Sequence, residues 1–187
     1  MGSKFVMSDP GLCIGCKTCM AACLTKHDVT GDVAKARLNL VTTLSVSTPI
    51  VCHHCEAAPC ASVCPTHALY RDGNRVAVRA ENCIGCRSCV MACPYGAVDV
   101  VVSDLTARLG NLAIKGVSHA AVIKCDLCVD RANGPACVAA CPTSSLRLVD
   151  SDDIEAEALR RRREAAADKA AFSSIPLTVA APAAATA

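Results

Sequence analysis

Residues 13–23 read CIGCKTCMAAC, and residues 83–93 repeat the same arrangement as CIGCRSCVMAC. In both stretches four cysteines follow the spacing C-x2-C-x2-C-x3-C. Two further quartets, at 52–64 and 125–141, have a longer middle step of four and eight residues. The chain therefore contains one motif in two alternating forms, present four times in all.

The composition makes these cysteines the first thing to explain. Sixteen of the 187 residues are cysteine, tryptophan is absent, and phenylalanine and tyrosine together number four. A core so poor in large side chains needs another source of cohesion, for which disulfides, zinc and iron-sulfur clusters are the alternatives. The N-terminal MGSKFVMSDP lacks an apolar signal segment and a twin-arginine pair, and no run of eighteen apolar residues occurs. We therefore expect a cytoplasmic protein without its own membrane span, associated with a membrane only through partner subunits.

The spacing within the quartets separates the possible metals. Zinc sites join two C-x2-C steps over a longer loop, whereas a [4Fe-4S] cube takes three thiolates from one tight loop. Gly15 and Gly85 would let the backbone come close to such a cube. His53 and His54 invite a zinc or Rieske-type interpretation, but their quartet already has four cysteines, so we expect them to pack. The sequence thus predicts four [4Fe-4S] clusters.

The prolines and linkers indicate how the quartets combine. Pro65, Pro94 and Pro142 each follow the last cysteine of a quartet, as in bacterial ferredoxins. In the two-cluster pattern the fourth cysteine of one quartet completes the cluster of another. Eighteen residues separate the second and third quartets, whereas twenty-eight and thirty-one separate the other neighbours. The middle quartets are therefore expected to form one local module, with the outer quartets pairing around it.

The remaining segments carry weaker signals. Residues 68–78 predict two strands around an Asp-Gly turn, and residues 98–123 predict an insertion between strands whose shape the sequence leaves open. Residues 151–172 predict a C-terminal helix with intrahelical Arg–Glu pairs, opened by a capping box of Asp152 and Glu155. Residues 173–187 carry no charge and form an Ala/Pro-rich tail that is either disordered or laid along a partner.

Charge and missing motifs exclude other functions. The formal net charge is +2, but each oxidised cube with its thiolates carries about −2, so the holoprotein reaches about −6. No basic face for nucleic acid follows from this balance. Lys17, Arg87 and Lys124 lie within or beside quartets, where each is either a solvated charge or a cation that raises a cluster potential. Without a nucleotide loop or a Ser/His/Asp set, the chain is expected to have no catalytic residues and to conduct electrons for partners.

Several stretches go beyond cysteine spacing. They are CIGC at 13–16, CHHCEAAPC at 52–60, CPYGA at 93–97, KCDLC at 124–128 and GPAC at 134–137. With these stretches, residues 4–150 resemble the four-cluster ferredoxin-like electron-transfer subunits of molybdopterin oxidoreductases and hydrogenases. The likeness is greatest to the small iron-sulfur subunit of formate hydrogenlyase and of hydrogen-dependent CO2 reductase.

This resemblance implies an α+β fold with two bacterial-ferredoxin-like modules, each holding two clusters with short hairpins and helices, followed by a helix and an extended tail. The polyferredoxin core would span 1–150, with an outer module from 4–40 and 112–150 and an inner module from 48–100. The implied ligand sets are Cys13, Cys16, Cys19 and Cys141 for cluster 1; Cys125, Cys128, Cys137 and Cys23 for cluster 2; Cys52, Cys55, Cys60 and Cys93 for cluster 3; and Cys83, Cys86, Cys89 and Cys64 for cluster 4.

The resemblance also implies partners. Electrons would pass between a molybdopterin or tungstopterin formate dehydrogenase catalytic subunit and a hydrogenase or further iron-sulfur subunits. The alternatives are the electron-transfer subunit of carbon monoxide dehydrogenase and a free polyferredoxin carrier. Residues 151–187 favour a fixed subunit over a diffusing carrier, because a carrier needs no such extension.

Metal analysis tests the cluster assignment. Iron and acid-labile sulfide are expected at about four atoms of each per cluster, and removal of the metal is expected to unfold the core, because the clusters join distant segments. Circular dichroism of the apoprotein measures the second effect. Zinc without sulfide would contradict the assignment, and a native spectrum without metal would contradict the structural role of the clusters.

Overall fold

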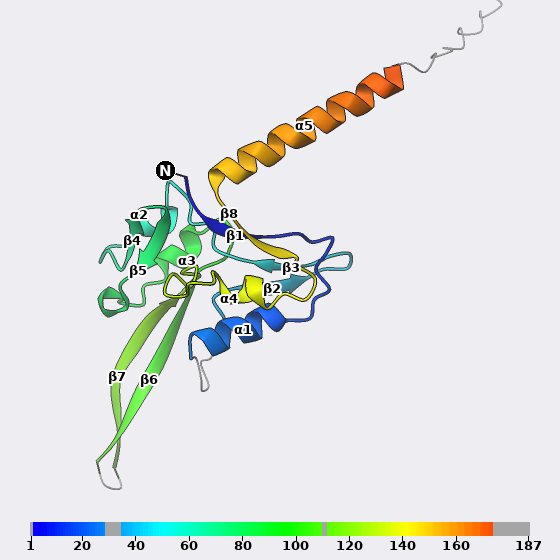
Figure 1. Cartoon of the computed structure of the whole chain (residues 1–187). Helices are drawn as coiled ribbons and strands as arrows, with labels where there is room; N and C mark the ends of the chain where they lie inside the picture. The colour runs from blue at the N-terminus through cyan, green and yellow to red at the C-terminus, as the bar shows by residue number, and fades with distance from the viewer. Residues whose placement is uncertain (1, 29–34, 110–111, 174–187) are drawn as a thin grey trace, which may run out of the picture. The chain divides into compact units, whose positions relative to one another are not determined.

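The computed structural model describes residues 2–28, 35–109 and 112–173 (Figure 1). The chain divides into two compact units, Met1–Ser151 and Asp152–Ala187, and each is described by itself. The Ala/Pro-rich tail predicted at 173–187 lies outside the described residues except for Ser173.

The first unit combines short helices with two-stranded antiparallel sheets. In chain order its elements are β1 (Phe5–Ser8), α1 (Thr18–Lys26), β2 (Asn39–Thr42), β3 (Ser47–Ile50), α2 (Pro59–Ser62), β4 (Leu69–Asp72), β5 (Arg75–Val78), a 3-10 turn (Ala80–Asn82), α3 (Ser88–Ala92), β6 (Asp99–Leu109), β7 (Leu112–Ile123), α4 (Ala136–Ala139) and β8 (Leu146–Val149). The strands pair as β1–β8, β2–β3, β4–β5 and β6–β7. The α+β fold class is therefore confirmed.

Each C-x2-C-x2-C quartet forms a tight loop that runs into a helix. Lys17 and Arg87 occupy equivalent positions before α1 and α3, and both have left-handed backbone angles, with φ of 61° and 62°. The helix α3 ends at Ala92, because a residue followed by proline disfavours helical geometry and Pro94 follows Cys93. Leu24 stands where the other quartets have proline, and α1 accordingly continues through Cys23 to Lys26.

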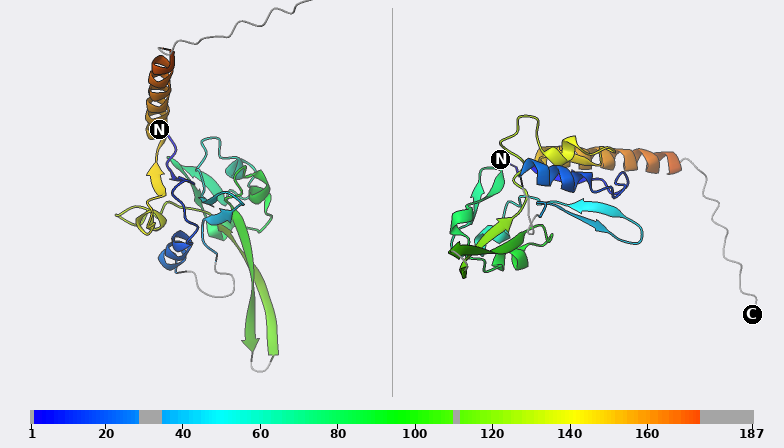
Figure 2. Two further views of the ribbon diagram at one scale, coloured as in Figure 1. Left: turned by 90° about the vertical axis from the view of Figure 1, so that its right-hand side faces the viewer. Right: turned by 90° about the horizontal axis from the view of Figure 1, so that it is seen from below.

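The outer quartets lie together, and so do the inner ones. β1 pairs with β8 from Phe5 opposite Val149 to Ser8 opposite Leu146, and α1 contacts α4. The helix of the second quartet, α2, contacts α3 of the third quartet and the strand β4. The N-terminal and C-terminal strands of this unit thus close around the quartets that are farthest apart in the sequence (Figures 1 and 2).

Of the strand pairs β4–β5 and β6–β7, the sequence predicted only the first. The predicted hairpin at 68–78 is confirmed, since β4 pairs with β5 and Gly73 takes a φ of +57° in the turn. Residues 99–109 and 112–123, whose shape the sequence left open, form the paired strands β6 and β7, which project from the rest of the unit (Figures 1 and 2). The expected end of the inner module at 100 lies within β6, and the expected start of the second outer segment at 112 coincides with the first residue of β7.

Small aliphatic residues and cysteines fill the interior. One buried cluster combines Val6, Leu38, Val51 and Leu146 with cysteines of the first, second and fourth quartets. A second cluster surrounds Leu69 and contains cysteines of the second and third quartets. The core thus has few large side chains, as the composition predicted, and the cysteine side chains occupy its centre.

The described part of the second unit lies in the helix α5 (Ser151–Ser173), whose first residue is the last of the first unit. This helix begins before the predicted capping box, so Asp152 and Glu155 lie within its first turns rather than at its N-cap. Arg160 pairs with Glu157 and Glu164 on the exposed surface, which confirms the predicted intrahelical ion pairs. Among the helices that the structure describes, none is long and apolar enough to span a bilayer.

Gly85 provides a test of the close packing around the third quartet. A Cβ atom there would lie 2.9 Å from the Cβ of Ala120, and φ is +72°. The matched variant is Gly73→Ala, where φ is also positive but no atom lies within 4 Å. We expect Gly85→Ala to cost about 1–3 kcal/mol more than Gly73→Ala through overpacking, and so to lose clusters roughly tenfold faster in denaturant. Visible absorbance follows the loss, and equal rates for the two variants would contradict the close approach.

Candidate metal centres

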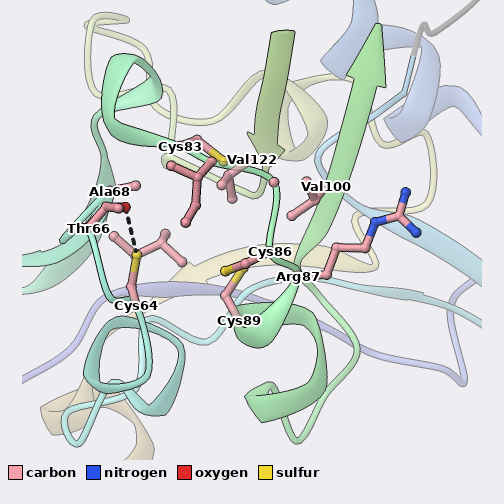
Figure 3. Close-up of a pocket in the computed structure, with 12 residues that line it drawn as sticks. Cys64, Thr66, Ala68, Cys83, Cys86, Arg87, Cys89, Val100 and Val122 are labelled. Atoms are coloured by element: carbon pink, nitrogen blue, oxygen red, sulfur yellow. Dashed lines mark hydrogen bonds between the residues drawn. The ribbon is translucent and has the colours of Figure 1, made fainter. Parts of the chain in front are cut away.

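The third quartet and one cysteine of the second quartet line a single cavity. Cys83, Cys86 and Cys89 come from the loop before α3 and from its first turn, and Cys64 follows α2. Figure 3 shows their side chains converging on one space, whereas Arg87 points away from it. Val100 of β6 and Val122 of β7 close the cavity, so the base of the long hairpin forms part of this site.

A second cavity has the same composition in the outer quartets. Its thiols come from Cys125, Cys128 and Cys137 of the fourth quartet and from Cys23 on α1. All four of these cysteines are buried. As in the first cavity, three thiols come from one quartet and one from a distant quartet.

The other eight cysteines fall into two groups whose members influence one another's ionisation. Negative charge on Cys141 opposes ionisation of Cys16, and negative charge on Cys13 and Cys16 opposes ionisation of Cys19. These four cysteines are therefore neighbours.

In the inner quartets, negative charge on Cys52 and Cys93 opposes ionisation of both Cys55 and Cys60. Two of the four predicted ligand sets thus share a cavity, and members of the other two lie within electrostatic range of one another.

Hydroxyl groups approach several of the thiols from the position two residues further along the chain. Thr18 donates a hydrogen bond to the Sγ of Cys16 at 3.3 Å and lowers the pKa of this thiol. The hydroxyls of Thr66 and Thr143 lie 3.7 Å from the Sγ atoms of Cys64 and Cys141. Figure 3 marks the first of these two contacts. The spacing Cys-x-Thr, repeated at these three cysteines, is the sequence signal for these hydroxyl groups.

Backbone amides also point at sulfur atoms. The N–H groups of Arg37, Ala97 and Leu127 donate to the Sγ atoms of Cys23, Cys93 and Cys125 at 3.3 to 3.4 Å. Hydrogen bonds to sulfur stabilise the anionic form and tune the potential of an iron-sulfur cluster. The backbone around these thiols is therefore arranged for thiolates rather than for neutral thiols.

Burial opposes ionisation of the innermost cysteines. It raises the pKa of Cys60 to about 11 and the pKa values of Cys125 and Cys137 to about 12. Such thiols become thiolates at neutral pH only when a metal binds, because a coordinating thiol loses its proton outright. A four-sulfur site fits zinc or iron-sulfur chemistry, and the three-cysteine loops favour the iron-sulfur cube.

The two histidines of the second quartet have packing roles, as predicted. The ring of His53 stacks between Phe5 and Tyr95, with centroid distances of 4.7 and 3.9 Å. His54 is fully buried, and its Nδ1 accepts a hydrogen bond of 3.0 Å from the backbone N–H of Val76.

A group beside Cys128 was missed by the sequence reasoning. The Nε2 of His27 lies 3.9 Å from the Sγ of Cys128 and 3.5 Å from Asp126, which also pairs with Arg37 at 2.6 Å. These side chains could hold a metal ion only by taking Cys128 from its thiol set. We therefore interpret His27 as a neighbour of that set. No sequence signal indicated it, because His27 and Asp126 are distant in the chain.

Comparison with known protein families indicates which kind of metal centre these sites hold. Residues 43–108 and 82–146 each match the 4Fe-4S dicluster domain, and residues 10–26 match a 4Fe-4S binding domain. These matches, together with the sixteen cysteines, exclude zinc as the intended metal and fit four [4Fe-4S] clusters.

Similar proteins occur in Escherichia coli K12. The chain is 42% identical to the electron transport protein HydN, over 88% of the chain and 98% of HydN. It is 40% identical to formate hydrogenlyase subunit 2, over 87% and 89% of the two chains, and 34% identical to hydrogenase-4 component A, over 95% and 97%. This chain therefore belongs to the family of ferredoxin-like electron-transfer subunits with 4Fe-4S dicluster domains, and it carries four [4Fe-4S] clusters.

Proposed function

We propose that this chain conducts electrons between a formate dehydrogenase catalytic subunit, with molybdopterin or tungstopterin, and a hydrogenase or further iron-sulfur subunits. The names of formate hydrogenlyase subunit 2 and hydrogenase-4 component A support a place in formate and hydrogen metabolism. A bound [4Fe-4S] cube accepts and releases one electron at a time. The protein's own contribution is to hold the thiols, exclude water and set the local charge.

We propose the ligand sets that the resemblance implies; shared cavities support the second and fourth sets, and charge interactions support the first and third. The first set is Cys13, Cys16, Cys19 and Cys141; the second is Cys23, Cys125, Cys128 and Cys137; the third is Cys52, Cys55, Cys60 and Cys93; and the fourth is Cys64, Cys83, Cys86 and Cys89. Each set joins two quartets, so each bound cube would tie together segments that are distant in the sequence.

The four sets form a series in space. The first and second sets are within electrostatic range, because negative charge on Cys19 opposes ionisation of Cys137. The third and second sets are related in the same way through Cys52 and Cys125. Cysteines of the third and fourth sets share one buried cluster of side chains. Each set therefore neighbours the next, which is the arrangement that a conductor needs.

The observation that carries the proposal is the exposure of the two ends of this series. Cys16 of the first set and Cys86 of the fourth set are exposed, whereas the second set is wholly buried. Apolar side chains stand in solvent beside both ends. Ile14 is 67% exposed, Ile84 is 64% exposed and Met91 is 87% exposed. Apolar surface of this kind marks interaction sites, so each end is suited to a different partner.

Two alternatives remain for the partner. The electron-transfer subunit of carbon monoxide dehydrogenase would share the series of clusters and differ only in the enzyme at one end. A free polyferredoxin carrier would also share the series but would have little use for exposed isoleucine and methionine at its ends, since it must dissociate from each partner. We therefore favour a fixed subunit.

Double substitutions test the ligand sets. Cys64→Ala alone and Cys83→Ala alone are each expected to remove one cluster, about four iron atoms. The double variant Cys64→Ala/Cys83→Ala is expected to lose no more than either single variant, because both thiols serve one cube. The matched pair Cys64→Ala/Cys52→Ala is expected to lose two clusters. Iron and sulfide assays measure this, and additive loss in the first pair would overturn the proposed sharing of ligands.

The function is tested on the tagged holoprotein purified anaerobically with its natural partners. Formate and hydrogen are each expected to bleach the visible absorbance of the clusters. Bleaching by carbon monoxide alone would favour the carbon monoxide dehydrogenase alternative. A holoprotein that purifies alone, yet is reduced when partner extracts are added, would favour the free carrier.

Variants of one end sharpen this test. Met91→Glu is expected to slow reduction by one of the two substrates at least tenfold, equivalent to about 1.4 kcal/mol of docking free energy. Reduction by the other substrate is expected to stay unchanged. Leu148→Glu on β8 is the control, because Leu148 is also exposed, at 42%, but lies outside the surface hollow that Met91 lines together with Cys86. Equal effects of the two variants would contradict docking at the fourth set.

A further inference from the structure

Three cations lie within or beside the quartets, and the structure separates them by burial. Lys17 and Arg87 are exposed, whereas Lys124 is only 2% exposed. The Nζ of Lys124 donates to the backbone carbonyls of Val76 at 2.6 Å and of Cys125 at 2.7 Å. Among the side chains that the structure describes, no carboxylate forms an ion pair with it. Lys124 is therefore a buried ammonium whose hydrogen-bond partners are neutral carbonyls.

A hydrogen-bonded chain fixes Lys124 between two quartets. Its partner Val76 lies on β5, and the N–H of the same residue donates to the Nδ1 of His54. Arg71 donates to the carbonyls of His54 and Cys55 at 2.8 and 2.7 Å. The loop of the second quartet is thus connected through β5 and Lys124 to the first cysteine of the fourth quartet.

The charge of Lys124 reaches thiols of two different ligand sets. The Nζ of Lys124 bonds the carbonyl of Cys125, and its other acceptor, Val76, packs in the same buried cluster as Cys60. Cys60 belongs to the third set and Cys125 to the second. Arg71, the other cation nearby, is only half-buried and acts on Cys55 of the third set. Lys124 is therefore the described cation that influences both sides of the junction between the inner and outer quartets.

His54 adds no second charge at this junction. The Nδ1 of His54 accepts a hydrogen bond from the N–H of Val76, so this nitrogen carries no proton and the ring is neutral. The proton of the neutral ring is therefore on Nε2. His54 thus orients the Val76 peptide group, and the ammonium of Lys124 supplies the local charge.

We propose that Lys124 sets the potentials at the middle of the series, raising those of the second and third clusters together relative to the first and fourth. The inference rests on the proposed ligand sets. Reduction adds negative charge to an already anionic cluster, and a fixed cation nearby favours it. Screening by water and salt is weak at a buried site and strong at the exposed Lys17 and Arg87. One residue therefore couples the inner and outer modules electrostatically.

Redox titrations of the intact holoprotein, followed by electron paramagnetic resonance, test this role. The neutral variants are Lys124→Gln, which can still donate to the carbonyls, and Lys124→Met. For two of the four clusters, the equilibrium constant for reduction is expected to fall at least tenfold, which corresponds to 59 mV for a one-electron couple. The other two clusters are expected to shift by less than threefold. Lys124→Arg keeps the charge and is expected to restore all four potentials to within threefold of the wild-type values.

Lys17→Gln and Arg87→Gln are the matched controls, since they remove exposed cations beside the first and fourth sets and are expected to shift every potential by less than threefold. A Lys124→Gln protein with unchanged potentials, or with equal shifts in all four clusters, would overturn the proposal. So would neutral variants that fail to assemble four clusters while Lys124→Arg assembles them, because Lys124 would then act in assembly. The paired cysteine variants separate these outcomes from a failure of the ligand sets, which would appear as additive iron loss in Cys64→Ala/Cys83→Ala.

Discussion

Thiols from distant parts of the chain must converge on common points, and the rest of the first unit depends on this constraint. Cys23 meets Cys125, Cys128 and Cys137 in one cavity, although most of the chain lies between them. The β1–β8 pair and the contact of α1 with α4 bring these segments together. Since the other buried side chains that the structure describes are mainly Ala, Val and Leu, iron-sulfur bonds supply the cohesion that a small domain otherwise takes from large buried residues.

Burial varies systematically along the series of thiol sets. At one end Cys16 is exposed and a hydrogen bond from Thr18 lowers its pKa, and at the other end Cys86 is exposed with its pKa lowered by hydrogen bonds from the Ser88 backbone and side chain. In the middle, burial raises the pKa of Cys125 and Cys137 to about 12. The same low-dielectric environment that disfavours free thiolates also strengthens any nearby charge. A single buried cation therefore has its greatest effect on the clusters in the interior of the series. At the two ends, water and partner proteins have the greater effect.

Local repetition made much of this protein predictable from its sequence. The spacing of each quartet, Gly15 and Gly85 with φ near +70°, and the Asp-Gly turn at Gly73 are all local features, and the structure reproduces them. The pairing of quartets followed from the short linker between the inner two, because loop closure favours near neighbours. The sequence analysis left the shape of the β6–β7 segment open, although residues 110–111 read Gly-Asn, a turn signal of the same kind as Asp-Gly.

The residues that the sequence could not assign are those whose meaning depends on three-dimensional neighbours. Lys17, Arg87 and Lys124 are equivalent in the sequence, since each lies in or beside a cysteine quartet. They differ only because β5 passes beside the start of the fourth quartet and offers the carbonyl of Val76 to Lys124. His54, which the sequence already assigned to packing, contacts the same valine, whose N–H its Nδ1 accepts. Val76 on β5 thus connects the inner and outer quartets. Its N–H donates to His54, and its carbonyl accepts from Lys124 and so fixes the position of the buried charge.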